Sequence, residues 1–284
     1  MTLSIDRSAF VETALALALK AGERIMEIYM TDFAVGTKTD CSPVTEADTA
    51  AEAIILAGLR STYPALPLIA EEAVAGGQVP EIGDTFVLID PLDGTREFTS
   101  RNGAFTVNIA LVENGVPVAG IVHAPALGRT FGGIVSNAAT GTQDSEQTAG
   151  AFEIVNATRQ AISTRKSAEQ DRIAVASLSH RDTDTDAFLK AAHVEKIVSI
   201  GSSLKFCLLA AGEADLYPRY GRTMEWDTAA GHAVLAAAGG IVTRTNGAAF
   251  LYGKKNQIND ADFANPGFIA YGDPSLAMTL GNPD

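Results

Sequence analysis

The sequence predicts a mixed α and β protein in two parts, the first rich in antiparallel strands and the second alternating strand with helix. Three observations predict this fold class. A long amphipathic segment opens the chain, Asn-Gly pairs join strand-like runs, and apolar runs downstream are each followed by helix-compatible sequence. We place the division so that residues 1–155 form an N-terminal α+β part and residues 156–284 a C-terminal α/β part.

Two helices are expected near the start of the chain. Apolar side chains recur at three- and four-residue steps over residues 8–29, the spacing of an amphipathic helix. A second helix is expected from about Thr45 to Arg60. Thr45 and Asp48 form the T-x-x-D pattern of a capping box, which by itself would explain Asp48.

Strands dominate the rest of the first part. The apolar run at 85–90 predicts a buried strand, and the stretch 105–125 predicts a hairpin around Asn114-Gly115, a strong hairpin signal. The polar stretch 136–150 is rich in Ser, Thr and Gly, which favours an exposed loop or hairpin tip.

The second part of the chain is expected to alternate strands with helices. Residues 172–180 and 195–203 resemble strands, and helix-compatible sequence follows each of them. Residues 226–240 predict a helix that ends at Gly239-Gly240. Residues 241–252 then predict a hairpin around Asn246-Gly247.

Composition excludes several classes of protein. The formal net charge of the 284 residues is −13, whereas proteins that bind nucleic acid or anionic lipid usually carry a basic surface. We expect no secretory signal and no membrane span, and therefore a soluble cytoplasmic protein. Cys41 and Cys207 are too few for a disulfide framework, so both are expected to stay reduced.

Carboxylates gather at the ends of apolar elements. They occur in the pair Glu71-Glu72, in the DPLDGT stretch at 90–95, and at Asp227 near an expected helix start. Each has a structural explanation when taken alone, since Asp227 could be a helix N-cap and Asp-Pro and Asp-Gly pairs form turns. Taken together they match the oxygen ligands that Mg²⁺ prefers, and bound metal would let an acidic chain bind a phosphorylated molecule.

The DPLDGT stretch suits such a site. Pro91 fixes φ and predicts a rigid turn that can present the Asp90 carboxylate, the Leu92 carbonyl and the Asp93 carboxylate to one cation. Gly94 and Thr95 would open the next helix, whose N–H groups can bind a phosphate oxygen. The stretch also excludes an aspartyl-phosphate mechanism, because Pro91 stands where that mechanism needs its nucleophilic Asp.

These motifs resemble a known family. "DPLDGTREF", preceded by "AEE" and followed by "WDTAAGHAVLAAAGG", is similar to the lithium-sensitive, Mg²⁺-dependent inositol monophosphatase superfamily. Within it, "IGSSLKFCLLAAGEADLYPRYG", "RNGAFTVNIALV" and "FANPGF" resemble the CysQ-type 3′(2′),5′-bisphosphate nucleotidases. The resemblance extends from about Thr45 to Tyr271, and Ala70 departs from relatives that often carry Gly or Ser there.

The resemblance implies a fold and a mechanism. The fold is a layered αβαβα sandwich with the active site between its two halves. More than one Mg²⁺ is expected per site, with Li⁺ as an inhibitor. Thr95 and Asp48 match the pair that positions the attacking water, and Gly94 and Thr95 would hold the phosphate. The implied metal ligands are Glu71, Asp90, the Leu92 carbonyl, Asp93 and Asp227.

The expected substrate is adenosine 3′,5′-bisphosphate, cleaved to AMP and phosphate, with its sulfated analogue as a further possibility. Its second phosphate needs cations, which makes Lys205, Arg219 and Arg222 candidates. Ser202, Ser203, Tyr220 and Asp227 complete the expected substrate contacts. One alternative is an inositol or sugar monophosphatase with the same metal site, and another is a binding protein that has lost catalysis. The oligomeric state stays open between monomer and homodimer.

Overall fold

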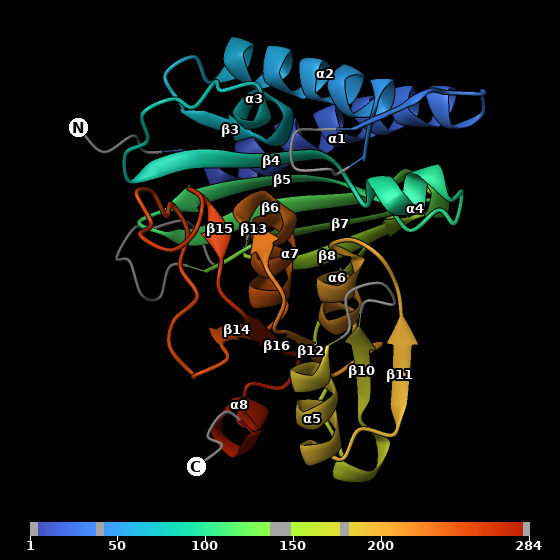
Figure 1. Cartoon of the computed structure of the whole chain (residues 1–284), viewed down its shortest axis with the longest axis vertical. Coiled ribbons are helices and arrows are strands. Elements are labelled where there is room, and N and C mark those ends of the chain that lie inside the picture. Colours follow the sequence, from blue (N-terminus) through green and yellow to red (C-terminus); the bar gives the residue numbers. More distant parts are fainter. Residues whose placement is uncertain (1–4, 38–42, 137–148, 177–181, 281–284) are drawn as a thin grey trace.

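The structure is a computed structural model that describes residues 5–37, 43–136, 149–176 and 182–280. Its main helices and sheets stack in layers, in the order helix, sheet, helix, sheet, helix (Figure 1). This order confirms the layered mixed fold that the sequence predicts. In the part of the chain that the structure describes, no helix combines the length and apolar surface needed to cross a membrane.

The first helical layer consists of α1 (Arg7–Tyr29) and α2 (Glu46–Thr62), which cover one face of the larger sheet (Figure 1). Its strands, in spatial order, are β3 (Leu68–Ala70), β4 (Thr85–Asp93), β5 (Thr106–Glu113), β6 (Val116–Ala124), β7 (Arg129–Ile134), β8 (Gly150–Val155) and β9 (Thr158–Ile162). β3 runs parallel to β4, and every other neighbouring pair is antiparallel.

The other face of this sheet packs on the middle layer, α6 (Leu204–Ala210) and α7 (Glu225–Ala237). Below lies the smaller sheet, in the order β11 (Lys196–Ser199), β10 (Ile173–Ala176), β12 (Leu216–Arg219), β16 (Phe268–Tyr271) and β14 (Ile241–Arg244). The last layer consists of α5 (Thr183–Ala191) and α8 (Ser275–Leu280).

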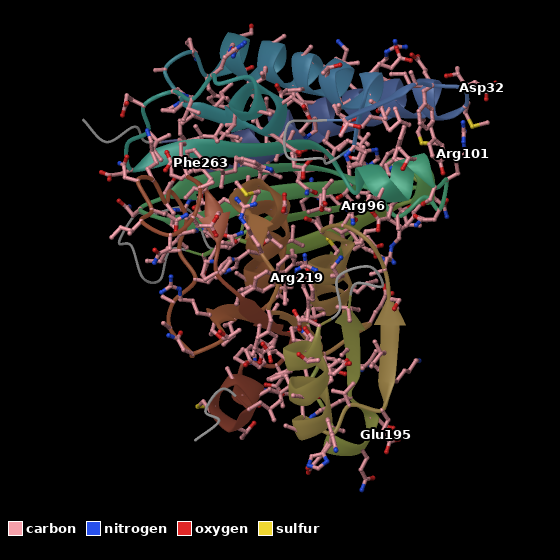
Figure 2. The ribbon with its side chains drawn as sticks, in the orientation of Figure 1. Asp32, Arg96, Arg101, Glu195, Arg219 and Phe263 are labelled. Carbon is pink, nitrogen blue, oxygen red and sulfur yellow. The ribbon has the colours of Figure 1, made fainter. Side chains whose placement is uncertain are left out.

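Short elements complete the chain. They are α3 (Glu71–Ala75), α4 (Thr95–Thr99), the hairpin β1 (Val35–Thr37) and β2 (Pro43–Thr45), the pair β13 (Thr223–Met224) and β15 (Ala264–Asn265), and the 3₁₀ turns Pro125–Leu127 and Glu169–Asp171. Figure 2 shows Arg96 on α4, and Arg219 near the centre of the molecule between the two sheets.

Strand β4 shows why an uninterrupted apolar run forms a central strand. Successive side chains of a strand point to opposite faces. Phe86 and Leu88 belong to the core that contains α6 and α7, whereas Val87 and Ile89 belong to the core under α1 and α2. Because both faces are covered by helices, the central run Phe86–Ile89 is apolar at every position.

Three details differ from the sequence prediction. The predicted boundary at 155/156 falls in the turn between β8 and β9, so β9 continues the larger sheet. The hairpin at Asn246-Gly247 is minimal, since the returning chain makes one bridge, Thr243 to Ala249, and β14 pairs mainly with β16. Within 90–95, the chain stays in β4 as far as Asp93 through an irregularity between Asp90 and Asp93, rather than leaving it in a turn.

Other predictions are confirmed or lie beyond the described residues. Helices form at Arg7–Tyr29, Glu46–Thr62 and Glu225–Ala237, close to the predicted bounds. Cys207 is buried with a free thiol, and burial raises the pKa of that thiol. Cys41 and most of the predicted loop 136–150 lie outside the described residues.

Candidate active site

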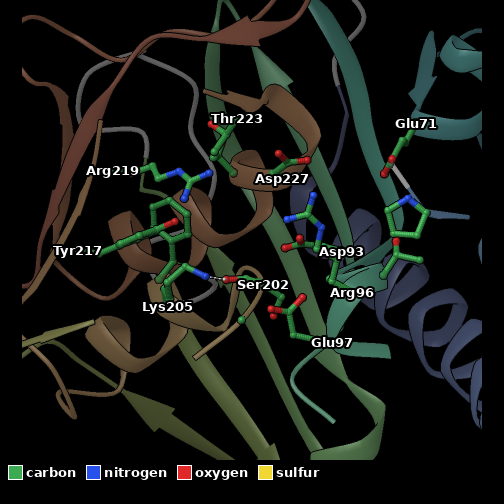
Figure 3. A pocket seen from close by; sticks show the side chains of 16 residues that line it. Glu71, Asp93, Arg96, Glu97, Ser202, Lys205, Tyr217, Arg219, Thr223 and Asp227 are labelled. Atoms are coloured by element: carbon green, nitrogen blue, oxygen red, sulfur yellow. Dashed lines mark hydrogen bonds between the residues drawn. The ribbon is translucent and has the colours of Figure 1, made fainter. Parts of the chain in front are cut away.

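A pocket of about 210 Å³ lies where the end of β4 and the start of α4 meet the segment before α6, the end of β12 and the start of α7. Charged side chains of both signs line its wall, and Arg96 lies beside Asp93 among the carboxylates. Figure 3 shows Arg219, Tyr217 and Lys205 on one side, and Asp227, Asp93 and Glu71 toward the other. These residues come from both halves of the chain, so folding assembles the pocket from distant segments.

Asp93 reaches the pocket through the irregular end of β4. Pro91 and Leu92 interrupt the pairing with β5, and Gly94 then takes φ 94°, a left-handed conformation that strongly favours glycine. A Cβ at Gly94 would also lie 3.2 Å from the Ala104 carbonyl oxygen. The chain can therefore turn directly from Asp93 into α4, which places Asp93 and Thr95 on the same wall.

Hydrogen bonds orient the Asp93 carboxylate. Its Oδ2 accepts from the Ser203 backbone N–H at 2.6 Å and from Asn108 Nδ2 at 3.4 Å. Burial raises the pKa of Asp93, while the nearby Lys205 charge and the Ser203 hydrogen bonds lower it. Asp93 thus lies in a polar but largely dehydrated position.

Asp227 lies across the pocket, in the first turn of α7. It is the third residue of that helix and not its N-cap, and its Oδ2 accepts from the N–H of the capping residue Met224 at 2.8 Å. Burial raises the pKa of Asp227 well above its ordinary value, and the negative charges of Asp93 and Glu71 raise it further. Glu71 begins α3 directly after β3, on the same side.

Thr95 and Asp48 form the predicted pair. The Thr95 hydroxyl lies 3.2 Å from Asp48 Oδ1 and 3.4 Å from the Leu92 carbonyl oxygen. Asp48 Oδ2 accepts from both the backbone N–H and the hydroxyl of Thr45, each at 2.8 Å. The structure therefore confirms the capping box of α2 and brings the same aspartate to Thr95.

Asp90 and Leu92 lie behind the pocket wall. Both are almost fully buried, and Asp90 Oδ1 accepts from the Leu92 backbone N–H at 3.0 Å. Neither belongs to the described lining residues. In the described part of the chain, no three His, Cys, Asp or Glu side chains converge as a preformed metal centre, so the metal ligands stay a prediction.

The cationic side is built around Lys205, which is only 5% exposed. Its Nζ donates to the carbonyl oxygens of Ser202 at 2.8 Å and Ile200 at 3.2 Å, and lies 5.4 Å from the Tyr217 ring centre. Burial lowers the pKa of Lys205 to about 8, although the Asp93 charge raises it. Arg219 lines the same side, oriented by bonds to the carbonyls of Gly221 and Arg222.

The predicted substrate contacts separate into two groups. Gly94, Thr95, Ser202, Lys205, Arg219 and Asp227 line the pocket. Ser203 is 1% exposed and lies outside the wall. Tyr220 packs near Phe188 and lines a different cavity, and Arg222 pairs with Asp260 at 2.9 Å on the surface.

Sequence reasoning did not single out several residues of the site. Asn108 is a buried amide inside an apolar strand, which is itself a signal, because buried polar groups require partners. Tyr217 stands two positions before Arg219 on β12, so the two-residue period of a strand places both on one face. Glu97, Thr223 and Thr228 also line the pocket, and no local sequence pattern marks them.

Known proteins resemble this chain over most of its length. The model of the inositol monophosphatase family matches residues 6–271. The chain is 42% identical over 254 residues to the 3′(2′),5′-bisphosphate nucleotidase CysQ of Escherichia coli K12, covering 89% of this chain and 95% of that protein. It is 41% identical over 260 residues to CysQ of Salmonella typhimurium, covering 91% and 98%.

Solved structures share the fold. A crystal structure of CysQ from Bacteroides thetaiotaomicron, a bacterial member of the inositol monophosphatase family, aligns with a TM-score of 0.72 and 36% identity, covering 93% of this chain and 97% of that one. An inositol monophosphatase from Anabaena aligns with a TM-score of 0.70 and 25% identity, covering 96% and 94%.

Proposed function

The chain belongs to the inositol monophosphatase family, and from that premise we propose that it is a metal-dependent 3′(2′),5′-bisphosphate nucleotidase. The observation that carries the proposal is the two-sided pocket. Three carboxylates gather on one side, where Arg96 also lies, and a buried lysine, an arginine and a tyrosine stand on the other. A substrate with two phosphate groups can place one phosphate on the acidic side of the pocket and the other on the cationic side. The curated relatives named as bisphosphate nucleotidases support the same conclusion.

The chemistry of the acidic side fits Mg²⁺. Glu71, Asp93 and Asp227 line one wall; burial raises the pKa of Asp227, and the negative charges of Asp93 and Glu71 raise it further. A hard divalent cation relieves such repulsion and prefers oxygen ligands. We propose these three carboxylates as metal ligands. Asp90 and the Leu92 carbonyl, which lie behind the pocket wall, are the further ligands of a site that holds more than one ion.

The metal supplies two things when bound: it offsets the charge of the phosphate group and makes hydroxide accessible near neutral pH. Thr95 and Asp48 orient the attacking water. When the Thr95 hydroxyl donates its proton to Asp48, its oxygen can accept a hydrogen bond from water in the pocket. Gly94, which lets β4 turn into α4, leaves room for the phosphate beside Thr95.

The cationic side selects the substrate. Lys205 and Arg219 would bind the phosphate that is not cleaved, with Tyr217 and Ser202 beside them. In adenosine 3′,5′-bisphosphate, our proposed substrate, this is the 5′-phosphate when the 3′-phosphate is hydrolysed to give AMP. The sulfated analogue carries a 5′-phosphosulfate, so it fits the same arrangement.

A second candidate function is an inositol or sugar monophosphatase. The likeness to an inositol monophosphatase structure over 96% of the chain favours it, because the acidic side would serve a monophosphate equally well. Such an enzyme would not need Lys205 or Arg219. The difference between the two functions therefore rests on the cationic side.

A phosphate-release assay with Mg²⁺ tests the proposal, using adenosine 3′,5′-bisphosphate, inositol 1-phosphate and fructose 1,6-bisphosphate as substrates. We expect fastest turnover of the nucleotide, selective loss of that preference in Lys205→Ala, and loss of most turnover on every substrate in Asp93→Asn. Equal turnover of inositol 1-phosphate, unchanged by Lys205→Ala, would favour the monophosphatase. No release from any substrate would favour a binding protein.

Lithium provides an additional arm of the same assay. We expect millimolar Li⁺ to inhibit the wild-type enzyme at fixed Mg²⁺, as the family resemblance implies. Full activity at that concentration would count against the proposed branch of the family without affecting the substrate panel.

A further inference from the structure

Ser203 links the two halves of the pocket without forming part of its wall. It stands directly before α6 and is 1% exposed, so a substrate in the pocket cannot reach its side chain. Its backbone N–H donates to Asp93 Oδ2 at 2.6 Å, and its hydroxyl donates to the Asp227 carbonyl oxygen at 2.5 Å. One residue thus contacts the residue that ends β4 and a residue in the first turn of α7.

A third partner fixes the direction of these hydrogen bonds. Asn108 Nδ2 donates to Ser203 Oγ at 2.9 Å. Since that amide nitrogen can only donate, Ser203 Oγ accepts from it and directs its own proton to the Asp227 carbonyl. The same amide lies 3.4 Å from Asp93 Oδ2, which ties Asn108 to both ends of the connection.

The backbone around Ser203 holds it in this position. Ser202 has φ 56°, a left-handed conformation that is uncommon for a residue other than glycine. Lys205 Nζ donates to the carbonyls of Ile200 and Ser202, which closes the loop that carries Ser203. Strain of this kind persists where the surrounding contacts enforce it, and here it aims the Ser203 N–H at Asp93.

We propose that Ser203, supported by Asn108, is a positioning residue that sets the separation between Asp93 and Asp227. This inference rests on the proposed function, in which these two carboxylates bind metal. It also replaces the predicted role of Ser203 as a substrate contact. Groups that orient metal ligands typically alter metal affinity or activity by about 10- to 100-fold when they are removed.

The direct test is metal binding by Ser203→Ala in the absence of substrate, measured with Mn²⁺ by the loss of its free electron paramagnetic resonance signal. We expect about a 10-fold weaker Mn²⁺ affinity than in the wild type. We also expect a matching rise in the Mg²⁺ concentration that gives half-maximal phosphate release. Mn²⁺ affinity within twofold of the wild type would overturn the proposal.

Thr130→Val is the matched control. Thr130 lies on β7, and its buried hydroxyl forms a hydrogen bond of 2.8 Å with His123 Nδ1 on β6. Neither residue lines the pocket. We expect its Mn²⁺ affinity to equal that of the wild type. An equal loss in this control would overturn the proposal, because the effect would then come from general packing.

Asn108→Ala and the double variant Asn108→Ala/Ser203→Ala complete a double-mutant cycle. If both residues act through one connection, the double variant should lose little more Mn²⁺ affinity than either single variant. Additive losses would overturn the coupled role. Asn108→Ala also provides the test should Ser203→Ala fail to fold, as judged by thermal unfolding. Because Mn²⁺ binding needs no substrate, these results stay informative even if the substrate panel refutes the nucleotidase.

Discussion

The two carboxylate oxygens of Asp48 have different partners. Its Oδ2 closes the first turn of α2 through the backbone and hydroxyl of Thr45, and its Oδ1 faces the Thr95 hydroxyl. The helix cap therefore holds in place the carboxylate that we propose acts with Thr95. A capping pattern and a catalytic role are compatible in one residue, because a carboxylate has two oxygens.

Thr95→Val should separate catalysis from stability. The change removes the hydroxyl that we propose orients water, so kcat for adenosine 3′,5′-bisphosphate should fall at least about 100-fold, in the range expected for acid–base assistance. KM and the melting temperature should stay near the wild-type values, since the cap of α2 is intact. Steady-state kinetics and thermal unfolding measure these quantities.

Thr99→Val is the control for that change. Thr99 lies on the same short helix, its hydroxyl donates to the Arg96 carbonyl at 3.1 Å, and it does not line the pocket. Its kcat should match the wild type. A Thr95→Val enzyme that retained kcat within threefold would show that the reaction does not use this hydroxyl.

Lys205 should impose a pH dependence on substrate capture. Burial lowers its pKa to about 8, so the ammonium charge is present below that pH and is lost as the pH rises through it. The attraction for a phosphate group is lost with the charge. We expect kcat/KM for the bisphosphate nucleotide to fall above about pH 8, because this ratio reports groups of the free enzyme.

Lys205→Met should remove that pH dependence. The variant keeps an unbranched apolar side chain beside Tyr217 but carries no charge at any pH. Its kcat/KM should be low throughout and should show no decline attributable to an ionisation near pH 8. The same decline in wild type and variant would assign the ionisation to another group.

At the scale of elements, the start of α7 is held by a buried polar cluster. Glu225 is fully buried and accepts from the backbone N–H groups of Gly253 and Lys254, at 2.7 and 2.9 Å, and from Lys254 Nζ at 2.7 Å. Asn265 donates to the hydroxyls of Thr223 and Thr228, which line the pocket. These contacts fix the turn of helix that carries Asp227.

Glu225→Gln should destabilise the protein substantially. It leaves the partly buried Lys254 ammonium without its counter-charge, and breaking a fully buried ion pair costs about 3–5 kcal/mol, which is the upper bound here. Urea unfolding should register this loss. Glu27→Gln is the control, because Glu27 pairs with Arg24 on the surface, where a pair contributes roughly 0–1 kcal/mol. Equal stability of the two variants would contradict the structural role of Glu225.

At the scale of the whole molecule, local sequence patterns correctly predicted the helices and hairpins that depend on residues close together in sequence. The periodicity of residues 8–29 and the Asn114-Gly115 turn are local, and helix α1 and the β5–β6 hairpin formed as expected. The carboxylates of the pocket followed from spaced motifs. The predicted division at 155/156 instead falls inside a two-residue hairpin turn, Asn156-Ala157, by which β9 pairs directly with β8. Both turn residues have positive φ, yet the pair lacks the glycine that usually marks such a turn in a sequence.

The roles of individual residues depend even more on tertiary packing. Tyr220 and Arg222 adjoin Arg219 in sequence, yet the chain leaves β12 there and carries both away from the pocket. Ser203 is adjacent to the lining residue Ser202 but points into the core. The sequence therefore predicted which segments reach the pocket. Which of their side chains face it could be read only from the folded structure.

Helix α7 packs between the two sheets and carries Asp227 at its first turn, so its distance from the larger sheet affects stability and site together. Glycines on the sheet permit the close approach. A Cβ on Gly120 of β6 would lie 2.7 Å from the Ala230 carbonyl oxygen, and one on Gly133 of β7 would lie 2.9 Å from the Val234 Cα. Both obstacles are backbone atoms, which cannot rotate away.

Gly120→Ala should therefore displace α7. Overpacking of a core typically costs about 1–3 kcal/mol, and we expect a loss of that size in urea unfolding together with weaker Mn²⁺ binding, because Asp227 moves with the helix. Gly83→Ala is the control, since a Cβ there meets nothing within 4 Å and the backbone is not left-handed. If Gly120→Ala lost stability but kept wild-type Mn²⁺ affinity, the position of α7 would not determine the geometry of the carboxylates.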